Sequence, residues 1–408
     1  MSTSGPDGID LADLGHFQRG IPHEVFARLR AAAPVHRNPG GDDAFWSLLR
    51  HEDVSAVNRD SRRFSSERRR ILMFEQTSLE GPDDPRMMIE IDPPRHTRYR
   101  RLVNRGFTPR MVATLEPRMR EIARSATLAA LRERRFDFAT QLANRLPVQV
   151  ICELTGVPAS DHGYVEELSD RIQAGAARGA TGAGIATDEI AELCAYANHF
   201  ADARRDELAR GRAADDILTT LLSADVDGQA LSREEFGLFF LLLAVAGNET
   251  TRSALSGGAL AFARHPEQWA RLRARPELLP GAIEEILRWT TPILYMARTA
   301  TCDVELRGEK IREGERVVLW YASANFDEAV FDDPLRFDVT RTPNEHVAFG
   351  AGGPHFCLGA NLARLELRVM LGELLPRVAE FRLAGPVVHA GSNFSNGIFS
   401  LPLEIAPA

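Results

Sequence analysis

The chain has 408 residues, of which 44% are hydrophobic, so it is long enough to bury a large core. Its formal net charge is −8 at pH 7, which argues against a protein that binds nucleic acids in general. Because the sequence lacks a run of about 18 apolar residues and begins with the polar segment 1–8, we expect neither a signal peptide nor a membrane anchor.

The cysteines indicate a reducing compartment. Four are scattered along the chain, and none belongs to a Cys-x-x-Cys pair: Cys152, Cys194, Cys302 and Cys357. A secreted disulfide framework has paired spacings, whereas scattered free thiols are typical of the cytosol. The sequence therefore predicts a cytoplasmic protein.

The first half of the chain predicts mainly helices. Short helical patterns come first, together with an apolar run at 45–49 that predicts a strand. Residues 67–90 are rich in Arg, Asp, Pro and Met and predict an irregular loop. From 93 to about 228 the periodicity of apolar residues is helical. The glycine- and alanine-rich stretch 178–184 interrupts this pattern, and we predict a mobile lid there.

A basic helix is predicted to begin after Asp92. His96 and Arg100 are four residues apart and share one face of it. Further arginines form a basic cluster on an otherwise acidic protein: Arg95, Arg98, Arg101, Arg105 and Arg110. Such a cluster is either a solvated helix face or a docking patch for an acidic protein, where complementary charge mainly raises the association rate.

The longest predicted helix begins after Ser232, which forms a capping box with Glu235. It should continue to about Arg264, just before Pro266, over a length of roughly 50 Å. Its middle, residues 239–247, is apolar on every face, which predicts burial all round.

Polar residues interrupt this apolar helix at 248–252. A carboxylate and two hydroxyls are costly in such a place unless they are bonded or used. Gly247 weakens the helix, and a threonine hydroxyl can bond back to an earlier carbonyl and bend it. One reading is a structural kink in which Glu249 pairs with an arginine. The other is a groove for dioxygen, with Glu249 and Thr250 beside it as a proton relay.

Helical and extended patterns alternate in the remainder of the chain. Glu285 and Arg288 are three apart on an amphipathic helix and can form an ion pair, although Glu284 competes for the same arginine. Strands are predicted near 304–306 and 316–321, and the last strands flank a turn at 391–397. The pattern as a whole predicts a mainly α-helical protein with a minor β portion.

The segment from Phe349 to Gly359 joins a glycine-rich loop to the start of a helix. Gly350, Gly352 and Gly353 allow a tight bend and a close approach to a flat object, while Cys357 lies at the helix N-terminus. Free backbone N–H groups there favour a thiolate, which suits a sulfur ligand on a haem iron. The alternative is a buried core cysteine beside a turn.

This loop resembles the haem-binding loop of the cytochrome P450 family. Cys357 follows Phe349 by eight positions, one more than in the commonest form of the motif. The longer form is similar to one found among actinobacterial P450s that act on sterols and branched lipids. The resemblance extends from about Phe26 to Ala406, with at least five motifs in order, and implies a single haem domain over 1–408 with a long buried helix across the haem.

The resemblance also implies roles for individual residues. Cys357 would be the iron ligand, and Glu249 with Thr250 would match the oxygen-activation motif, in which an acid precedes a threonine. The haem propionates would be bound by His96, Arg100, Arg298 and His355. Further haem contacts would come from Phe349, Gly350, Ala246, Gly247 and Gly359. A structural network bracing the cysteine loop would consist of Glu285, Arg288 and Arg336.

The function implied is that of a haem-thiolate monooxygenase that carries haem b (iron protoporphyrin IX). It would insert one oxygen atom from O2 into a C–H bond of a sterol, a lipid or a natural-product intermediate, with electrons from ferredoxin and ferredoxin reductase. Besides the region 172–190, the substrate pocket would be lined by Met87, Met88, Val245, Ala246, Ile293, Leu294, Phe394 and Ile398. The alternatives are a peroxide-driven haem peroxygenase and a non-catalytic haem-binding or sensing protein.

Overall fold

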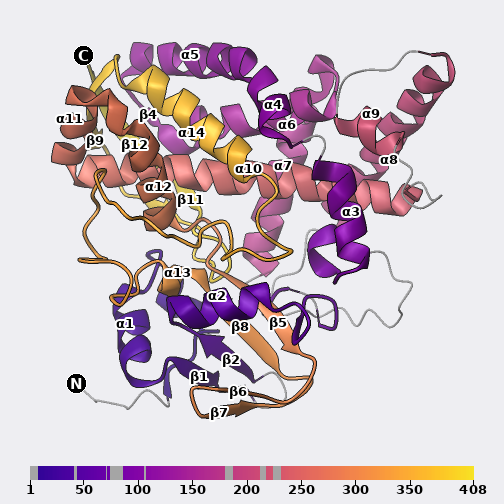
Figure 1. Cartoon of the computed structure of the whole chain (residues 1–408). Helices are drawn as coiled ribbons and strands as arrows, with labels where there is room; N and C mark the ends of the chain where they lie inside the picture. The colour runs from indigo at the N-terminus through magenta and orange to yellow at the C-terminus, as the bar shows by residue number, and fades with distance from the viewer. Residues whose placement is uncertain are drawn as a thin grey trace.

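A computed structural model describes most of the chain: residues 8–40, 44–69, 71–73, 86–104, 107–179, 187–211, 217–223 and 231–408. Figure 1 shows helices gathered around the long helix α10 in the upper part and a sheet with α1 and α2 beside it in the lower part. The prediction of a mainly α-helical protein with a minor β portion is confirmed.

The helices account for most of the described chain. In order they are α1 (His23–Ala32), α2 (His51–Arg59), α3 (Arg95–Asn104), α4 (Pro109–Thr114), α5 (Glu116–Glu133), α6 (Arg145–Thr155), α7 (His162–Gly179), α8 (Thr187–Ala209), α9 (Ile217–Leu222), α10 (Arg233–Arg264), α11 (Pro266–Ala274), α12 (Leu279–Thr290), α13 (Tyr321–Ala324) and α14 (Ala360–Leu374). Among the described residues, none of these helices has both the length and the apolarity needed to cross a bilayer.

The strands form four small sheets. They are β1 (Val35–Asn38), β2 (Phe45–Leu48), β3 (Phe64–Ser65), β4 (Arg135–Asp137), β5 (Tyr295–Ala300), β6 (Val304–Leu306), β7 (Glu309–Ile311), β8 (Arg316–Trp320), β9 (Val378–Leu383), β10 (Val388–His389), β11 (Ile398–Ser400) and β12 (Pro402–Pro407). The largest sheet has the order β1-β2-β8-β5-β3, in which only β2 and β8 run parallel. The other sheets are β4-β12-β9, β10-β11 and β6-β7. The strands predicted at 45–49, 304–306 and 316–321 are confirmed as β2, β6 and β8.

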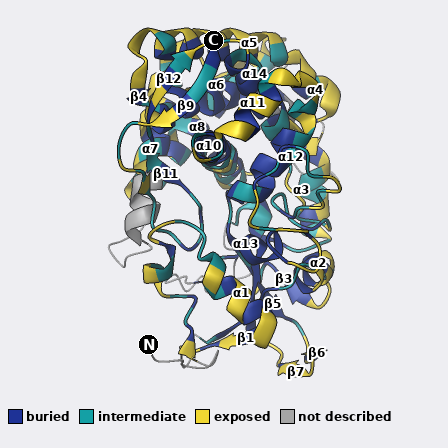
Figure 2. Ribbon diagram, turned by 90° about the vertical axis from the view of Figure 1, so that its left-hand side faces the viewer, coloured by how far each residue is buried: buried dark blue, intermediate teal, exposed yellow. Residues whose placement is uncertain are grey.

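The largest sheet is buried on both faces. Along β8, Val317 and Leu319 belong to one apolar cluster, whereas Val318 and Trp320 belong to another. This alternation follows from the two-residue period of a strand. Figure 2 shows buried residues on the sheet and in the helical part, where most apolar residues of α10 contribute to the main core. The sheet therefore holds β5, and with it Arg298, in a rigid setting.

Helix α10 begins and ends where the sequence predicts. The Ser232 side chain accepts a hydrogen bond from the N–H of Glu235, and the Glu235 carboxylate accepts one from the N–H of Ser232, at 3.1 and 2.8 Å. The helix ends at Arg264, before Pro266. The expectation of burial all round is wrong, because Ala246 is exposed. Together with half-buried Val245 it marks one face of α10 that neighbouring elements do not cover.

Two predicted features lie partly outside the described residues. Within the predicted irregular loop 67–90, residue 70 and residues 74–85 are not described, and a short 3-10 helix forms at Met88–Glu90. Helix α7 runs through the start of the predicted lid to Gly179, and the rest of that stretch lies outside the described residues.

Candidate active site

The glycines of the cysteine loop, residues 349–359, allow it to pack closely against the end of α2. Gly350, Gly352 and Gly353 all have positive φ, between 82° and 90°, where other residues would be strained. A Cβ atom at Gly353 would lie 2.7 Å from the carbonyl oxygen of Asn58 and 3.0 Å from Cα of Arg59. The close approach that the glycines permit at this point is thus to the backbone of α2, which the sequence did not reveal.

Asn58 links the cysteine loop to the largest sheet. Its Nδ2 donates to the carbonyl oxygen of Gly352 at 2.7 Å. Its Oδ1 accepts from the hydroxyl of Tyr321 at 2.9 Å and from Nη2 of Arg298 at 3.3 Å. Sequence analysis missed Asn58, because an asparagine near a helix end carries no signal of such distant partners.

Cys357 lies in an accessible position at the entry to α14, and its N–H donates to the carbonyl oxygen of Phe349 at 2.9 Å. Although the residue is exposed, the protein atoms around its sulfur desolvate it and raise the pKa of the Cys357 thiol, against the opposing influence of the Gly359 N–H and of the guanidinium groups of Arg100 and Arg364. The sequence predicted a thiolate from the helix N-terminus alone. In the protein by itself, desolvation outweighs that effect.

Four basic side chains from three elements meet near this loop. The rings of His96 (α3) and His355 have centroids 4.2 Å apart, and Arg298 (β5) is only 3% exposed. Burial, assisted by the charges of Arg100 and Arg298 and opposed by Asp92, lowers the pKa of His96 to about 4. Burial, together with the charges of Arg298, His96 and Arg100, also lowers the pKa of His355 far below its usual range. A cluster of this kind repels additional positive charge and attracts anions.

The unmet bonding capacity of this cluster fits a haem. Both ring nitrogens of His96 are buried without a partner among the described residues, although buried polar atoms are normally paired. No carboxylate of a described residue forms an ion pair with Arg100 or Arg298. A buried and a half-buried cation without an ion-pair partner, together with unbonded histidine nitrogens and an exposed cysteine, match a group with two carboxylates and a thiolate-liganded iron.

The polar segment of α10 presents Glu249 and Thr250 side by side. The Thr250 hydroxyl donates to the carbonyl oxygen of Ala246 at 2.8 Å, which is the back-bond predicted from the sequence. Glu249 forms no ion pair with any described residue, so the reading in which an arginine neutralises it is not supported. The nearest candidate, Arg252, instead reaches Asp170 on α7 at 3.4 Å.

The neighbours of this segment contact other helices. A Cβ atom at Gly247 would lie 2.6 Å from Cδ1 of Ile151, so this glycine lets α10 approach α6 closely. Thr251 is buried beside Glu366 of α14, and burial raises the pKa of Glu366 to about 8 against the opposing influence of the Thr251 hydroxyl. Sequence analysis missed Glu366, because a glutamate in an amphipathic helix is usually exposed.

The predicted network below the cysteine loop is present, with one correction. Glu285 and Arg288 are fully buried and form a bidentate pair at 2.8 and 2.9 Å. The second arginine on Glu285 is Arg341, at 3.1 Å, and not Arg336. The Arg336 side chain points to Asp338 at the surface, and only its carbonyl oxygen joins the network. Arg341 completes the network because the fold of the loop turns it inward.

Glu284 has a different partner from the one weighed in the sequence. It binds Arg364 of α14 through both oxygens at 2.7 Å, and His346 at 3.0 Å. Burial alone would raise the pKa of Glu284, but these hydrogen bonds lower it to about 2. The guanidinium of Arg364 lies 4.5 Å from the centre of the Phe349 ring. This arrangement ties α12 to the cysteine loop and to α14.

The structure brings together some of the predicted pocket residues. The N–H of Leu294 donates to the carbonyl oxygen of Phe394 at 2.8 Å, and Ile293 forms a β-bridge with Ser395. Ile398 differs from the prediction, since it lines a separate cavity of about 160 Å³.

The other predicted pocket residues lie on α10 and before α3. Val245 and Met87 are partly buried against the main core, and Met88 is buried in it. Ala246 is exposed on the uncovered face of α10. In the region 172–190, residues 180–186 lie outside the described residues.

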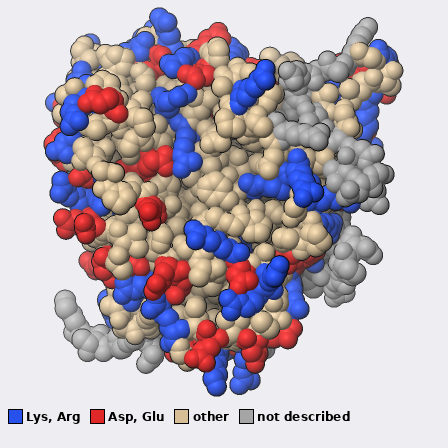
Figure 3. All heavy atoms as spheres, viewed as in Figure 1, with Lys and Arg blue, Asp and Glu red and all other residues tan. Residues whose placement is uncertain are grey.

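Basic side chains gather over α3 (Figure 3). Arg101 and Arg110 are exposed, Arg95 approaches Glu67 and Glu235 only at 3.7 and 3.9 Å, and Arg105 lies outside the described residues. Together with residues of other segments, two arginines of this patch line a surface cavity of about 1050 Å³: Arg98 and Arg101. The patch is therefore part of a concave surface, where the sequence predicted only a helix face.

Comparison with known proteins agrees with this site. A family model described as Cytochrome P450 matches residues 273–384. The chain is 41% identical to a steroid C26-monooxygenase of Rhodococcus jostii (strain RHA1), over 99% of this chain and 86% of that one. It is 40% identical to a methyl-branched lipid omega-hydroxylase of Mycobacterium tuberculosis (strain CDC 1551 / Oshkosh), over 97% and 94% of the two chains.

Solved structures show the same likeness over the whole fold. The Mycobacterium marinum cytochrome P450 CYP268A2, in complex with pseudoionone, superposes with a TM-score of 0.88 at 36% identity, over 99% of this chain and 100% of that one. CYP108D1 from Novosphingobium aromaticivorans DSM12444 superposes with a TM-score of 0.86 at 33% identity, over 99% and 98%. The chain therefore belongs to the cytochrome P450 family of haem-thiolate monooxygenases.

Proposed function

We propose that this protein is a P450 monooxygenase that inserts one oxygen atom from O2 into a C–H bond of a steroid or a branched lipid. The observation that carries the proposal is the accessible Cys357 next to a buried basic cluster without a counter-anion. The substrate class is supported by two relatives of about 40% identity, which are named a steroid C26-monooxygenase and a methyl-branched lipid omega-hydroxylase.

The cofactor in this proposal is haem b. Cys357 would ligate its iron, and the propionates would be bound by His96, Arg100, Arg298 and His355. The remaining contacts would come from Phe349, Gly350, Gly359 and Ala246. When bound, the haem supplies the redox chemistry of oxygen activation, and the protein supplies position, electrostatics and protection from water. The whole chain, 1–408, would act as one haem domain.

Glu249 and Thr250 would move protons to the oxygen. Glu249 has no ion-pair partner among the described residues, so its carboxylate can take up a proton and release it. The Thr250 hydroxyl donates to the carbonyl oxygen of Ala246, which leaves the lone pairs of its oxygen available to accept. A proton can then pass from the carboxyl of Glu249 toward Oγ1 of Thr250.

The substrate would lie against apolar side chains on the uncovered face of α10 and on the paired segments before β5 and β11. These side chains are Val245, Ile293, Leu294 and Phe394, with Met87 and Met88 from the segment before α3. A pocket of such composition favours a hydrophobic molecule and excludes water. It suits a steroid or a branched lipid, whose surface is largely apolar.

Electrons would come from a cytoplasmic ferredoxin and its reductase. The ferredoxin would dock at the basic patch, which includes Arg95, Arg98 and Arg101 on α3. Charge complementarity between an acidic ferredoxin and this patch would raise the association rate, and added salt would reduce it.

Carbon monoxide binding to the reduced, haem-reconstituted protein tests the proposal. We expect a red-shifted Soret band typical of thiolate ligation, which Cys357→Ser abolishes and Cys302→Ser retains, because Cys302 is an exposed cysteine outside the loop. Persistence of the band in Cys357→Ser would refute the assignment. Steroids and branched lipids are then screened for binding, which shifts the absorption spectrum of the resting protein. Compounds that bind are tested for turnover with ferredoxin and reductase. Equal turnover with hydrogen peroxide alone would favour a peroxygenase instead.

A further inference from the structure

A second polar cavity lies at the C-terminal half of α10, away from the cysteine loop. Its volume is about 160 Å³, and four segments of the chain enclose it: the segment before α1, α10, the end of α12 and the segment 389–398. Figure 2 looks along α10 from this side, with β11 and α12 on either side of the helix. The site already described accounts for none of its polar residues.

The ionisable residues that line this cavity are all basic. They are Arg19, His23, Arg264, His265 and His389. No carboxylate is among the described residues of its wall. The charge comes from the two arginines, Arg19 and Arg264, whose positive potential low-dielectric walls strengthen.

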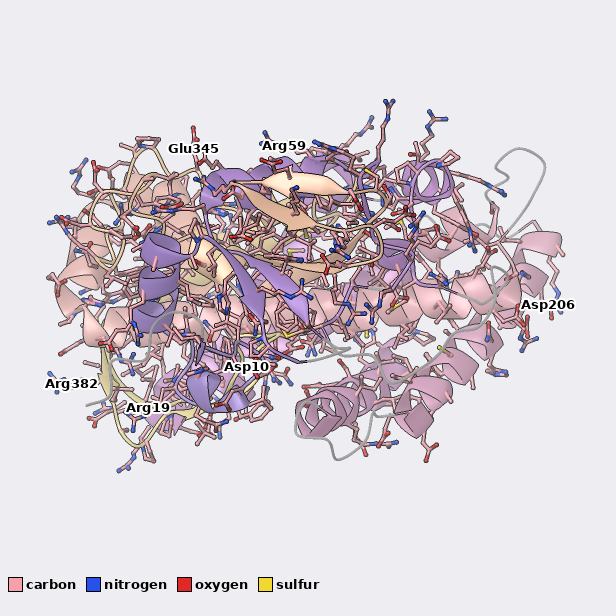
Figure 4. The ribbon with its side chains drawn as sticks, turned by 90° about the horizontal axis from the view of Figure 1, so that it is seen from below. Asp10, Arg19, Arg59, Asp206, Glu345 and Arg382 are labelled. Carbon is pink, nitrogen blue, oxygen red and sulfur yellow. The ribbon has the colours of Figure 1, made fainter. Side chains whose placement is uncertain are left out.

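The two arginines of the cavity have no counter-charge. Neither guanidinium forms an ion pair or a hydrogen bond with a residue that the structure describes, whereas exposed Arg275 nearby pairs with Glu277 at 3.0 Å. Figure 4 shows Arg19 at the edge of the molecule, next to the C-terminal part of the ribbon. At Gly20, an added Cβ would lie 3.5 Å from the ring of His389, which places the N-terminal segment against the segment 389–398.

Two buried nitrogen atoms in the wall also lack partners. They are Nδ1 of His23 and Nδ1 of His389, for which the described residues provide no hydrogen-bond partner. Burial lowers the pKa of His23 to about 4, with Arg30 and Arg288 acting in the same direction, and burial together with Arg264 lowers the pKa of His389. Each neutral ring can carry its proton on Nδ1 and donate it to an acceptor. A buried donor without an acceptor is rare in native proteins.

We propose that this cavity binds a small oxyanion of the size of phosphate. Arg19 and Arg264 would supply the positive charge, and Nδ1–H groups of His23 and His389 would donate hydrogen bonds to the oxygens. The anion would join the N-terminal segment, α10 and the segment 389–398. The last of these also reaches the catalytic region, since an added Cβ at Gly397 would lie 3.7 Å from Oε1 of Glu249.

Calorimetric titration of the haem-loaded protein with inorganic phosphate, at constant ionic strength, tests this site. We expect saturable binding that weakens about tenfold or more in Arg264→Gln and about fivefold in His389→Phe, because a charged and a neutral hydrogen-bond donor are removed. Sulfate should compete with phosphate, and acetate should bind more weakly because it carries one charge and two oxygens. Arg264 is exposed, so its replacement leaves the fold intact.

Arg101→Gln is the matched control, because it removes one arginine from the larger basic cavity beside α3. Phosphate affinity within about twofold of the unmodified protein is expected for it, since Arg101 touches none of the proposed ligands. Absence of saturable binding to the unmodified protein overturns the proposal. Equal weakening in Arg264→Gln and Arg101→Gln, or weakening only in Arg101→Gln, overturns it as well, because the anion would then bind diffusely or elsewhere.

Discussion

The network around Glu285, which braces the cysteine loop, and the middle of α10 differ in how completely their polar groups are bonded. Below the cysteine loop, the carboxylate of Glu285 accepts four partners at 3.1 Å or less: Arg288, Arg341, Asn344 and the N–H of Asp338. On α10, the hydroxyls of Ser253 and Ser256 are buried without a partner among the described residues, and Arg252 reaches Asp170 only at 3.4 Å.

The difference corresponds to two requirements of the proposed chemistry. A ligand loop has to hold its sulfur in one position, and fully bonded charges that are held by several elements achieve this. Groups that pass protons must keep free bonding capacity and small barriers to rearrangement. Four predictions test whether the fully bonded region mainly stabilises the fold and whether the less bonded region takes part in the reaction.

The largest effect is expected at Glu285. Glu285→Gln leaves the buried guanidinium of Arg288 without its counter-charge, and we expect the free energy of unfolding to fall by about 3–5 kcal/mol. Urea denaturation of the haem-loaded protein measures it. Glu277→Gln removes the partner of Arg275 in an exposed pair and should lower the free energy of unfolding far less. Similar losses in both variants would mean that burial of the network contributes little.

Replacement of Glu366 should have the next largest effect on the free energy of unfolding, and it should stabilise the protein. Burial raises its pKa from 4.5 to about 8, so between these pH values the folded state retains a proton that the unfolded state has released. Stability therefore falls as pH rises through this window, by about 1.4 kcal/mol per pH unit. Glu366→Gln should remove that slope and stabilise the protein at pH 7 by about 3 kcal/mol. Urea denaturation of both proteins at pH 5 and pH 7 measures this pH dependence. The prediction is contradicted if the variant loses as much stability between the two pH values as the unmodified protein.

Thr250→Ala should affect chemistry without affecting stability. Oxygen consumption should continue, while product formed per O2 falls about tenfold or more and hydrogen peroxide replaces it, because the hydroxyl that receives the proton is lost. Thr251→Val is the control, since Thr251 faces Glu366 on α14. It should change the pH dependence of unfolding and keep product yield. An unchanged yield in Thr250→Ala would discredit the assigned relay.

The smallest effect on the free energy of unfolding is expected at Glu284, which precedes Glu285 on α12. Hydrogen bonds lower the pKa of Glu284 to about 2, so its contribution to stability is present above pH 4.5 and is lost as pH falls toward 2. Glu284→Gln should lower the free energy of unfolding at pH 7 by about 1 kcal/mol, since the pair with Arg364 is partly exposed. Glu313→Gln, which breaks the exposed pair with Arg68, should change it by less than about half as much. No difference between the two would contradict a role for burial.

Local features of the molecule were predictable from the sequence alone. The limits of α10, its capping box and the back-bond of Thr250 follow from residues three or four positions apart, which a helix brings together regardless of the fold around it. The pair of Glu285 and Arg288 follows from the same rule. The sequence also determined that a cysteine precedes a helix, and the family resemblance that rests on it.

Only the tertiary structure decided which distant groups share a place. In the folded chain Arg341, and not Arg336, pairs with Glu285, and Gly353 packs against α2. Ile398 lines the smaller cavity, and Glu366 is buried beside Thr251. Desolvation of the Cys357 sulfur has the same origin, since it depends on every neighbour, whereas the helix N-terminus is a local property. Spacing along the chain specifies local bonds, but burial and long-range charge exist only after the elements have packed together.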